Sequence, residues 1–128
     1  MYNNKISLYL ICLLFTTAWL NAFPDISTED LKKAITEGKV AVIDVNGAKS
    51  FKKGRIPGAI DFSSQGKELQ NLLPQDKNTL VVAYCGGPSC RAYMKGAKAA
   101  SQLGYQNVRH LSAGISGWKK SGGKVEKD

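Results

Sequence analysis

The sequence predicts an α/β domain built on an open sheet. Two runs, residues 39–45 and 79–84, are almost entirely apolar and rich in β-branched side chains, as strands buried on both faces are. Helical patterns lie between and after these runs, and strands that alternate with helices form sheets that helices cover. Ligands of such sheets bind beyond the carboxyl ends of the strands. We therefore expect the site among the residues that follow each strand.

The elements around these runs have recognisable ends. Ser27 begins a helix as its N-cap, with Asp30 three residues on in the manner of a capping box, and Gly38 ends it. Pro57 and Gly58 form a turn between a helical turn and a short strand. Helical and alternating patterns then recur along the rest of the chain. The further expected elements are a helical turn at 48–54, helices at 65–73, 90–103 and 115–120, and a strand at 106–111.

The first 22 residues are expected to form a secretory signal peptide. Lys5 supplies the positive start, residues 6–20 are mostly apolar, and Ala22 is a small residue suited to cleavage. A membrane span needs about twenty apolar residues, so an uncleaved anchor is the weaker alternative. We therefore expect export to the periplasm. The predicted division is a signal peptide at 1–22, a domain at 23–122 and a polar tail at 123–128.

The charge of the chain limits its partners. It has 18 Lys and Arg against 10 Asp and Glu, a net charge of +8. Such an excess favours small anions, acidic proteins or membrane surfaces. The basic residues are scattered without a reading motif, so a nucleic acid is not expected. We expect an anionic small molecule as ligand and no stable membrane insertion after signal cleavage.

The segment after the second apolar run carries the chemistry. It consists of Cys85, Gly86, Gly87, Pro88, Ser89, Cys90 and Arg91. Glycines let successive backbone N–H groups turn inward as an anion-binding nest, and the following helix adds its positive end. Both favour thiolate over thiol at Cys85, and Arg91 adds a fixed positive charge. The loop therefore predicts a sulfur nucleophile facing a pocket for an oxyanion or a persulfide.

Other roles for the cysteines are a structural disulfide, a metal site and simple packing. Cys12 lies in the predicted signal, and a bridge between Cys85 and Cys90 closes too short a loop to stabilise the fold much. Zinc usually takes four Cys or His ligands, and His110 is the only histidine. We expect no metal site, and we expect His110 to be a partly buried strand residue. A cysteine that ends a strand often only packs, but the glycines and the arginine favour a nucleophile.

Three segments occur in order along the chain: VIDV with SFKKGRIPGA at 42–59, Tyr84-Cys85, and LGYQNV with LSAGISGW at 103–118. On these segments residues 26–122 resemble a single-domain rhodanese, a sulfurtransferase. The resemblance implies a parallel sheet of about five strands with helices on both faces, and no metal or organic cofactor. It also implies that Cys85 takes sulfane sulfur from a donor, carries it as a persulfide and passes it to a thiophilic acceptor. Asp44 and Arg55 lie in the first segment and are expected to support the site.

Three departures from the family pattern bear on the substrate. Asn46 stands where the family commonly has arginine, and the residues between Cys85 and Cys90 are neutral. Polysulfide or a protein persulfide is therefore expected beside thiosulfate as donor, with a thiol or a thiol reductase as acceptor. The third departure is Cys90 itself. It is either a packing residue or a resolving thiol that closes onto Cys85, which needs Cα atoms within about 7 Å.

Two other functions fit parts of the sequence. Cys85 and Arg91 have the Cys-x5-Arg spacing of dual-specificity phosphatases and rhodanese-like arsenate reductases, in which the arginine holds a tetrahedral oxyanion. No histidine precedes Cys85, and an exported chain suits neither enzyme. A non-catalytic rhodanese-like binding module is favoured by Asn46 and opposed by Cys85. The sulfurtransferase is the leading interpretation.

Overall fold

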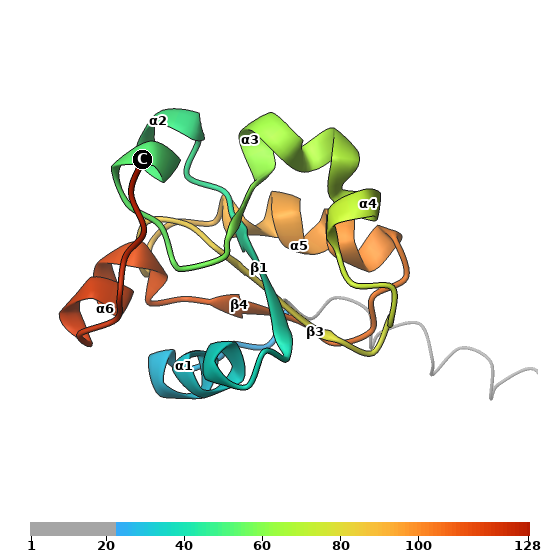
Figure 1. The fold of residues 1–128 in the computed structure, drawn as a ribbon, viewed down its shortest axis with the longest axis horizontal. Helices are drawn as coiled ribbons and strands as arrows, with labels where there is room; N and C mark the ends of the chain where they lie inside the picture. The colour runs from blue at the N-terminus through green and yellow to red at the C-terminus, as the bar shows by residue number, and fades with distance from the viewer. Residues whose placement is uncertain (1–22) are drawn as a thin grey trace, which may run out of the picture.

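The computed structural model describes residues 23–128, which form one parallel sheet between two layers of helices (Figure 1). The predicted signal peptide and Cys12 lie outside the described residues. The sheet has the order β2-β1-β3-β4, and every neighbouring pair is parallel. Its strands are β1 (Val40–Asp44), β2 (Ile60–Asp61), β3 (Leu80–Tyr84) and β4 (Val108–Leu111). The predicted open α/β architecture is confirmed.

The predicted strand number is corrected, because the sheet has four strands and not about five. Beside β4, the place of a fifth strand is taken by a single parallel bridge between Asp25 and His110. Pro24 contributes only its carbonyl, which accepts from His110 N, and Ile26 N donates back to His110 O. Ser27 then caps the next helix with its side chain. Since Pro24 lacks a backbone donor and a helix begins four residues later, this segment is too short to make a ladder.

The helices cover both faces of the sheet. Figure 1 shows α1 (Thr28–Thr36) and α6 (Gly114–Lys120) on one side, and α3 (Phe62–Gln65), α4 (Leu69–Leu72) and α5 (Tyr93–Gln102) on the other. The remaining short pieces are α2 (Ala48–Lys53) and the 3-10 turn η2 (Gly66–Glu68). Among residues 23–128, no helix has both the length and the apolar character that crossing a membrane needs.

Side chains alternate between two hydrophobic clusters, as a strand period of two requires. In β3, Val82 and Tyr84 pack toward α1 and α6, whereas Val81 and Ala83 pack toward α4 and α5. All four are fully buried. A strand buried on both faces must be apolar throughout, which explains the continuous run that predicted it.

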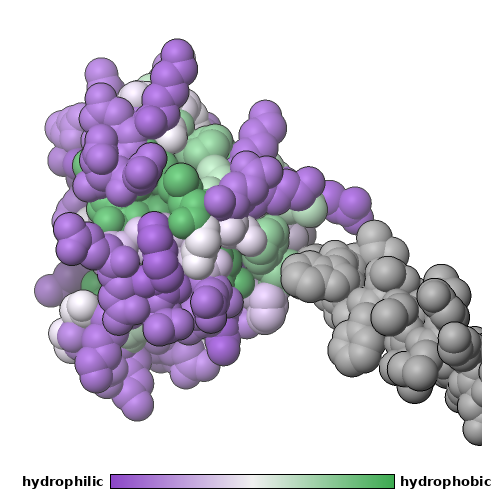
Figure 2. Space-filling model, turned by 90° about the vertical axis from the view of Figure 1, so that its right-hand side faces the viewer, coloured by the Kyte–Doolittle hydropathy of each residue, from purple (hydrophilic) through white to green (hydrophobic). Residues whose placement is uncertain are grey.

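The surface is predominantly polar. Figure 2 shows a face on which hydrophilic residues surround a small hydrophobic area. Among the large hydrophobic side chains of residues 23–128, Leu72 is the exposed one, at 41 %. The predicted polar tail lies against the domain, since Trp118 Nε1 donates to Lys124 O and Glu126 forms an antiparallel bridge with Arg55.

Candidate active site

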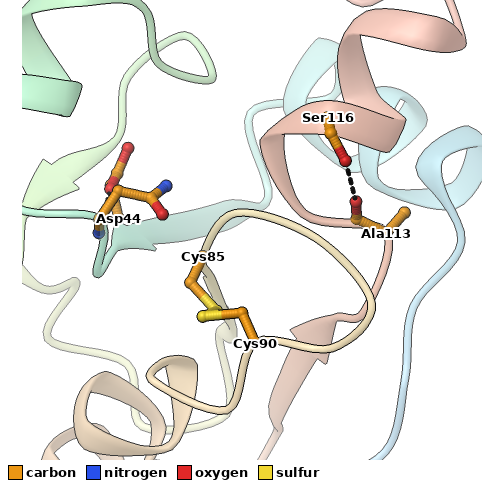
Figure 3. Close-up of a disulfide and its surroundings, with 6 residues drawn as sticks. Asp44, Cys85, Cys90, Ala113 and Ser116 are labelled. Atoms are coloured by element: carbon orange, nitrogen blue, oxygen red, sulfur yellow. Dashed lines mark hydrogen bonds between the residues drawn. A yellow bond between two sulfur atoms is a disulfide. The ribbon is translucent and has the colours of Figure 1, made fainter.

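The loop between β3 and α5 holds the two cysteines together. Cys85 directly follows β3 and is only 3 % exposed, while Cys90 is partly exposed. The two form a disulfide across the loop, with Cα atoms 6.3 Å apart (Figure 3). Both cysteines therefore lie in one site. The helix that was expected from residue 90 begins at Tyr93, so Cys90 and Arg91 belong to the loop.

The start of α6 fixes the first half of this loop. Ile115 N donates to Cys85 O at 2.9 Å, and Ser116 N donates to Gly86 O at 3.0 Å. Gly114 makes this approach possible, because a Cβ at its position would lie 2.5 Å from backbone atoms of Gly86 and Gly87. Its φ of +62° also favours glycine.

Gly114, Ile115 and Ser116 were not predicted as part of the site. They stand in the segment LSAGISGW, whose glycines were a signal for close backbone approach. The sequence could not show which backbone they approach, because α6 and the loop are separated by the whole of α5 and β4.

The amides of the loop are largely free to bind a ligand. Cys90 N donates to Gly87 O at 3.1 Å and closes a tight turn. Within the described part of the chain, no backbone carbonyl accepts from the other loop amides, which are those of Gly86, Gly87, Ser89 and Arg91. Pro88 has no N–H and lies exposed at the tip of the turn.

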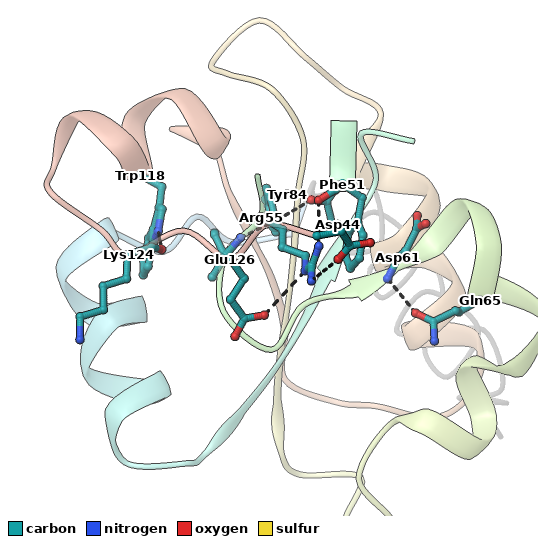
Figure 4. A network of polar contacts seen from close by, with 11 residues as sticks. Asp44, Phe51, Arg55, Asp61, Gln65, Tyr84, Trp118, Lys124 and Glu126 are labelled. Carbon is teal, nitrogen blue, oxygen red and sulfur yellow. Dashed lines mark hydrogen bonds and ion pairs between the residues drawn. The ribbon is translucent and has the colours of Figure 1, made fainter. Parts of the chain in front are cut away.

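Beneath the loop lies a buried polar network that joins the ends of β1 and β3 (Figure 4). Asp44 and Tyr84 are register partners, and Tyr84 Oη donates to Asp44 Oδ2 at 2.5 Å. Tyr84 Oη also accepts from Ile56 N at 3.1 Å, and Asp44 Oδ1 accepts from Asn46 N at 2.7 Å. The network therefore ties the chain after β1 to the strand that carries Cys85.

Burial dominates the ionisation of this network. It raises the pKa of Asp44 above its ordinary value of 3.8, although hydrogen bonds from Tyr84 and Asn46 oppose the rise. The pKa of Tyr84 is also raised, by burial first and then by its bond to Asp44. Tyr84 therefore stays protonated and serves as a donor to the carboxylate.

A small cavity opens beside Gly86. Its volume is about 290 Å³, and its lining residues are Asn46, Ser50, Lys53, Gly54, Gly86, Ile115 and Lys119. Lys119 Nζ lies 3.7 Å from the point that a Cβ on Gly54 would occupy. Neither Lys53 nor Lys119 forms an ion pair with another described residue. Since no acidic residue lines the cavity, its charge is positive.

The two arginines that were predicted to belong to the site, Arg55 and Arg91, have different surroundings. Arg55 is not a lining residue of the cavity, and its guanidinium pairs with Asp128 at 2.8 Å and Glu126 at 3.7 Å. It also lies over the ring of Phe51. Arg91 is exposed and forms no ion pair with another residue of the described range. His110 lies in β4, partly buried as predicted, and stacks on Tyr93.

The sequence pattern of the rhodanese-like domain matches residues 27–121, which is most of the chain and all of the sheet. The chain belongs to the rhodanese-like domain family. A curated relative, the tRNA uridine(34) hydroxylase of Buchnera aphidicola subsp. Acyrthosiphon pisum (strain Tuc7), is 29% identical over 102 residues. That match covers 73% of this chain and 30% of the relative, so the chain spans less than a third of the relative's length.

Solved structures share the rhodanese fold. The BH2092 protein from Bacillus halodurans has a TM-score of 0.63 at 26% identity, covering 97% of this chain and 85% of its own. The thiosulfate sulfurtransferase from Pseudomonas aeruginosa has a TM-score of 0.68 at 22% identity, covering 82% of this chain and 20% of its own. The second likeness concerns the fold alone. Membership of the rhodanese-like family supports a function of the sulfur-transfer type.

Proposed function

We propose that this rhodanese-like protein is a sulfurtransferase that carries sulfane sulfur as a persulfide on Cys85. One observation carries the proposal: Cys85 directly follows strand β3, at the base of a loop in which the amides of Gly86, Gly87, Ser89 and Arg91 donate to no backbone carbonyl of the described residues. A persulfide anion at Cys85 would find hydrogen-bond donors in those amides, and donors fixed in advance stabilise an anion best. The acceptor is a thiol or another thiophilic nucleophile.

The reaction starts from the reduced loop. The disulfide between Cys85 and Cys90 leaves no free sulfur to attack a donor, so it must first be opened by a thiol. Cys85 thiolate then attacks the outer sulfur of the donor, and the rest of the donor leaves with the electron pair of the broken S–S bond. With thiosulfate, the leaving group is sulfite.

Mass spectrometry of the reduced chain tests this proposal. In reduced Cys90→Ser, which has no second thiol to displace the added sulfur, exposure to thiosulfate or polysulfide should give a mass gain of about 32 Da, one sulfur atom, on the Cys85 thiolate. Cyanide should remove the added sulfur as thiocyanate. Cys85→Ser should show no gain with either donor. A reduced Cys90→Ser chain that gains no sulfur from any donor would sink the proposal.

The cavity beside Gly86 supports an anionic donor. Lys53 and Lys119 approach it from α2 and α6 without carboxylate partners in the described structure. They supply positive charge beside Asn46, where the family commonly has an arginine. A cavity of about 290 Å³ suits a small molecule or the end of a larger one. We propose thiosulfate, polysulfide or a protein persulfide as the donor, in a periplasmic setting.

Neutralising both lysines should weaken donor binding. In Lys53→Gln/Lys119→Gln we expect KM for thiosulfate to rise about tenfold with little change in kcat, because each exposed charge contributes under about 1 kcal/mol. Raising ionic strength should affect the wild type more than this variant. Lys98→Gln/Lys95→Gln, an equal loss of charge on exposed residues of α5, is the matched control and should leave KM unchanged. Equal KM values in all three proteins would show that Lys53 and Lys119 do not contribute to donor binding.

The phosphatase and arsenate reductase alternative is less well supported. It needs Arg91 to hold a tetrahedral oxyanion with its planar fork. In the structure Arg91 is exposed, and the disulfide occupies the nucleophile. Hydrolysis of an aryl phosphate that disappears in Arg91→Ala would favour this alternative.

A further inference from the structure

The disulfide between Cys85 and Cys90 contributes little to holding the loop. The two cysteines are five residues apart, and cross-links stabilise mainly by closing long loops in the unfolded chain. The loop is already fixed by backbone bonds, from Ile115 to Cys85, from Ser116 to Gly86, and within the turn from Cys90 to Gly87. A chemical role is the better explanation for a second cysteine at this point.

The two sulfurs differ in access. Cys85 is 3 % exposed, whereas Cys90 is partly exposed and follows a turn at the surface. An external thiol attacks the more accessible sulfur of a disulfide, and the other sulfur leaves as a thiolate. Attack on Cys90 therefore releases Cys85 as the thiolate, which is the form that accepts sulfane sulfur. This difference in access favours reduction of the disulfide by an external dithiol, with Cys85 released first.

We propose that Cys90 resolves the Cys85 persulfide, so that the protein releases sulfane sulfur as sulfide and becomes a dithiol-dependent sulfane-sulfur reductase. This step rests on the proposed persulfide at Cys85. The Cα separation of 6.3 Å lies within the range that allows the two side chains to bond. Transfer to a separate thiol acceptor is then replaced by transfer of two electrons from this chain.

The chemistry of the step balances. The sulfur of Cys90, as it loses its proton, attacks the inner sulfur of the Cys85 persulfide anion. A bond forms between Cys85 and Cys90, the bond to the outer sulfur breaks, and that sulfur leaves as HS⁻ with the Cys90 proton. The sulfane sulfur is reduced by two electrons, and the two cysteines are oxidised to the disulfide.

The cycle closes with a second exchange. An external dithiol attacks Cys90, forms a mixed disulfide and frees Cys85, and its second thiol then releases Cys90. With thiosulfate as donor, the sum is thiosulfate plus dithiol giving sulfite, sulfide and the oxidised dithiol. The reaction that supplies the substrate must therefore form sulfane sulfur, and a dithiol reductant must sustain it.

A single-turnover experiment tests the resolving step. Wild type and Cys90→Ser are reduced, freed of reductant without oxygen, and given whichever donor adds sulfur to Cys90→Ser; excess donor is then removed. We expect the wild type to release about one sulfide per chain, lose both thiols and end as the disulfide. Cys90→Ser should keep the gain of about 32 Da and release no sulfide until a thiol is added. Cys90→Ala should behave in the same way.

The outcomes separate the two proposals. A wild-type chain that keeps its persulfide and its Cys90 thiol, as Cys90→Ser does, would overturn the resolving role while leaving the persulfide intact. A Cys90→Ser chain that gains no sulfur from any donor would overturn the persulfide itself, and the resolving step with it. When donor and a dithiol are supplied together, faster sulfide release by the wild type than by Cys90→Ser would support the cycle, whereas equal rates would contradict it.

Discussion

Replacing Gly114 by alanine is expected to reduce sulfur transfer about a hundredfold, because misplacing catalytic groups by about 1 Å has effects of that size. The new Cβ would lie 2.5 Å from backbone atoms of Gly86 and Gly87. Backbone cannot rotate away as a flexible side chain does, so the loop itself must move. The bonds from Ile115 and Ser116 to the loop carbonyls would lengthen together.

The same substitution should also lower the free energy of unfolding. The positive φ costs a residue with a Cβ about 1–2 kcal/mol, and overpacking adds about 1–3 kcal/mol. Gly122→Ala is the matched control, since its φ is +81° but nothing lies within 4 Å of the added Cβ. It should lose stability through strain alone and keep its transfer rate. Thermal unfolding and single-turnover persulfide formation measure the two effects, and normal rates in Gly114→Ala would show that α6 does not position the loop.

The sequence predicted the sheet well because a strand that is buried on both faces appears in the sequence as a nearly continuous apolar run. Apart from Lys39, Asp44 and Thr79, residues 39–45 and 79–84 are apolar, and β1 and β3 lie within them. The expectation of about five strands came from the family resemblance, whereas the strand patterns along the chain numbered four, as in the sheet. Whether residues near Asp25 form a strand depends on Pro24 and on how soon the next helix begins, and a single bridge leaves no periodic pattern to detect.

The site was predictable only in part, since its members meet through tertiary structure. Cys85 stands out because it follows a strand and precedes glycines. Lys53 and Lys119 look like surface charges in the sequence and share a cavity only because α2 and α6 end near each other. Arg55 was expected to support the site because it lies in a segment that resembles the family. Its guanidinium instead forms an ion pair with Asp128.

Tyr84 and Asp44 illustrate how register creates a site that no local pattern reveals. Each ends an apolar strand, and the pairing of β1 with β3 places them opposite each other. Removing the hydroxyl in Tyr84→Phe would leave Asp44 Oδ2 and Ile56 N without this partner in a fully buried place. Unpaired buried polar groups cost about 1–3 kcal/mol each, and more when charged. We expect Tyr84→Phe to lose about 3–5 kcal/mol of unfolding free energy.

The pH dependence of this loss identifies its cause. The folded pKa of Asp44 is already raised above 3.8 by burial, so its contribution to stability falls as pH rises through that raised pKa. Tyr84→Phe removes a hydrogen bond that lowers this pKa and should raise it further. The difference in unfolding free energy between wild type and variant should therefore be larger near pH 7 than near pH 4. Tyr105→Phe, which removes one bond to the carbonyl of Pro74, is the control. Tyr105→Phe should lower the free energy of unfolding by about 1 kcal/mol at every pH. If denaturant titrations show that the loss in Tyr84→Phe is also independent of pH, a charged Asp44 is not its cause.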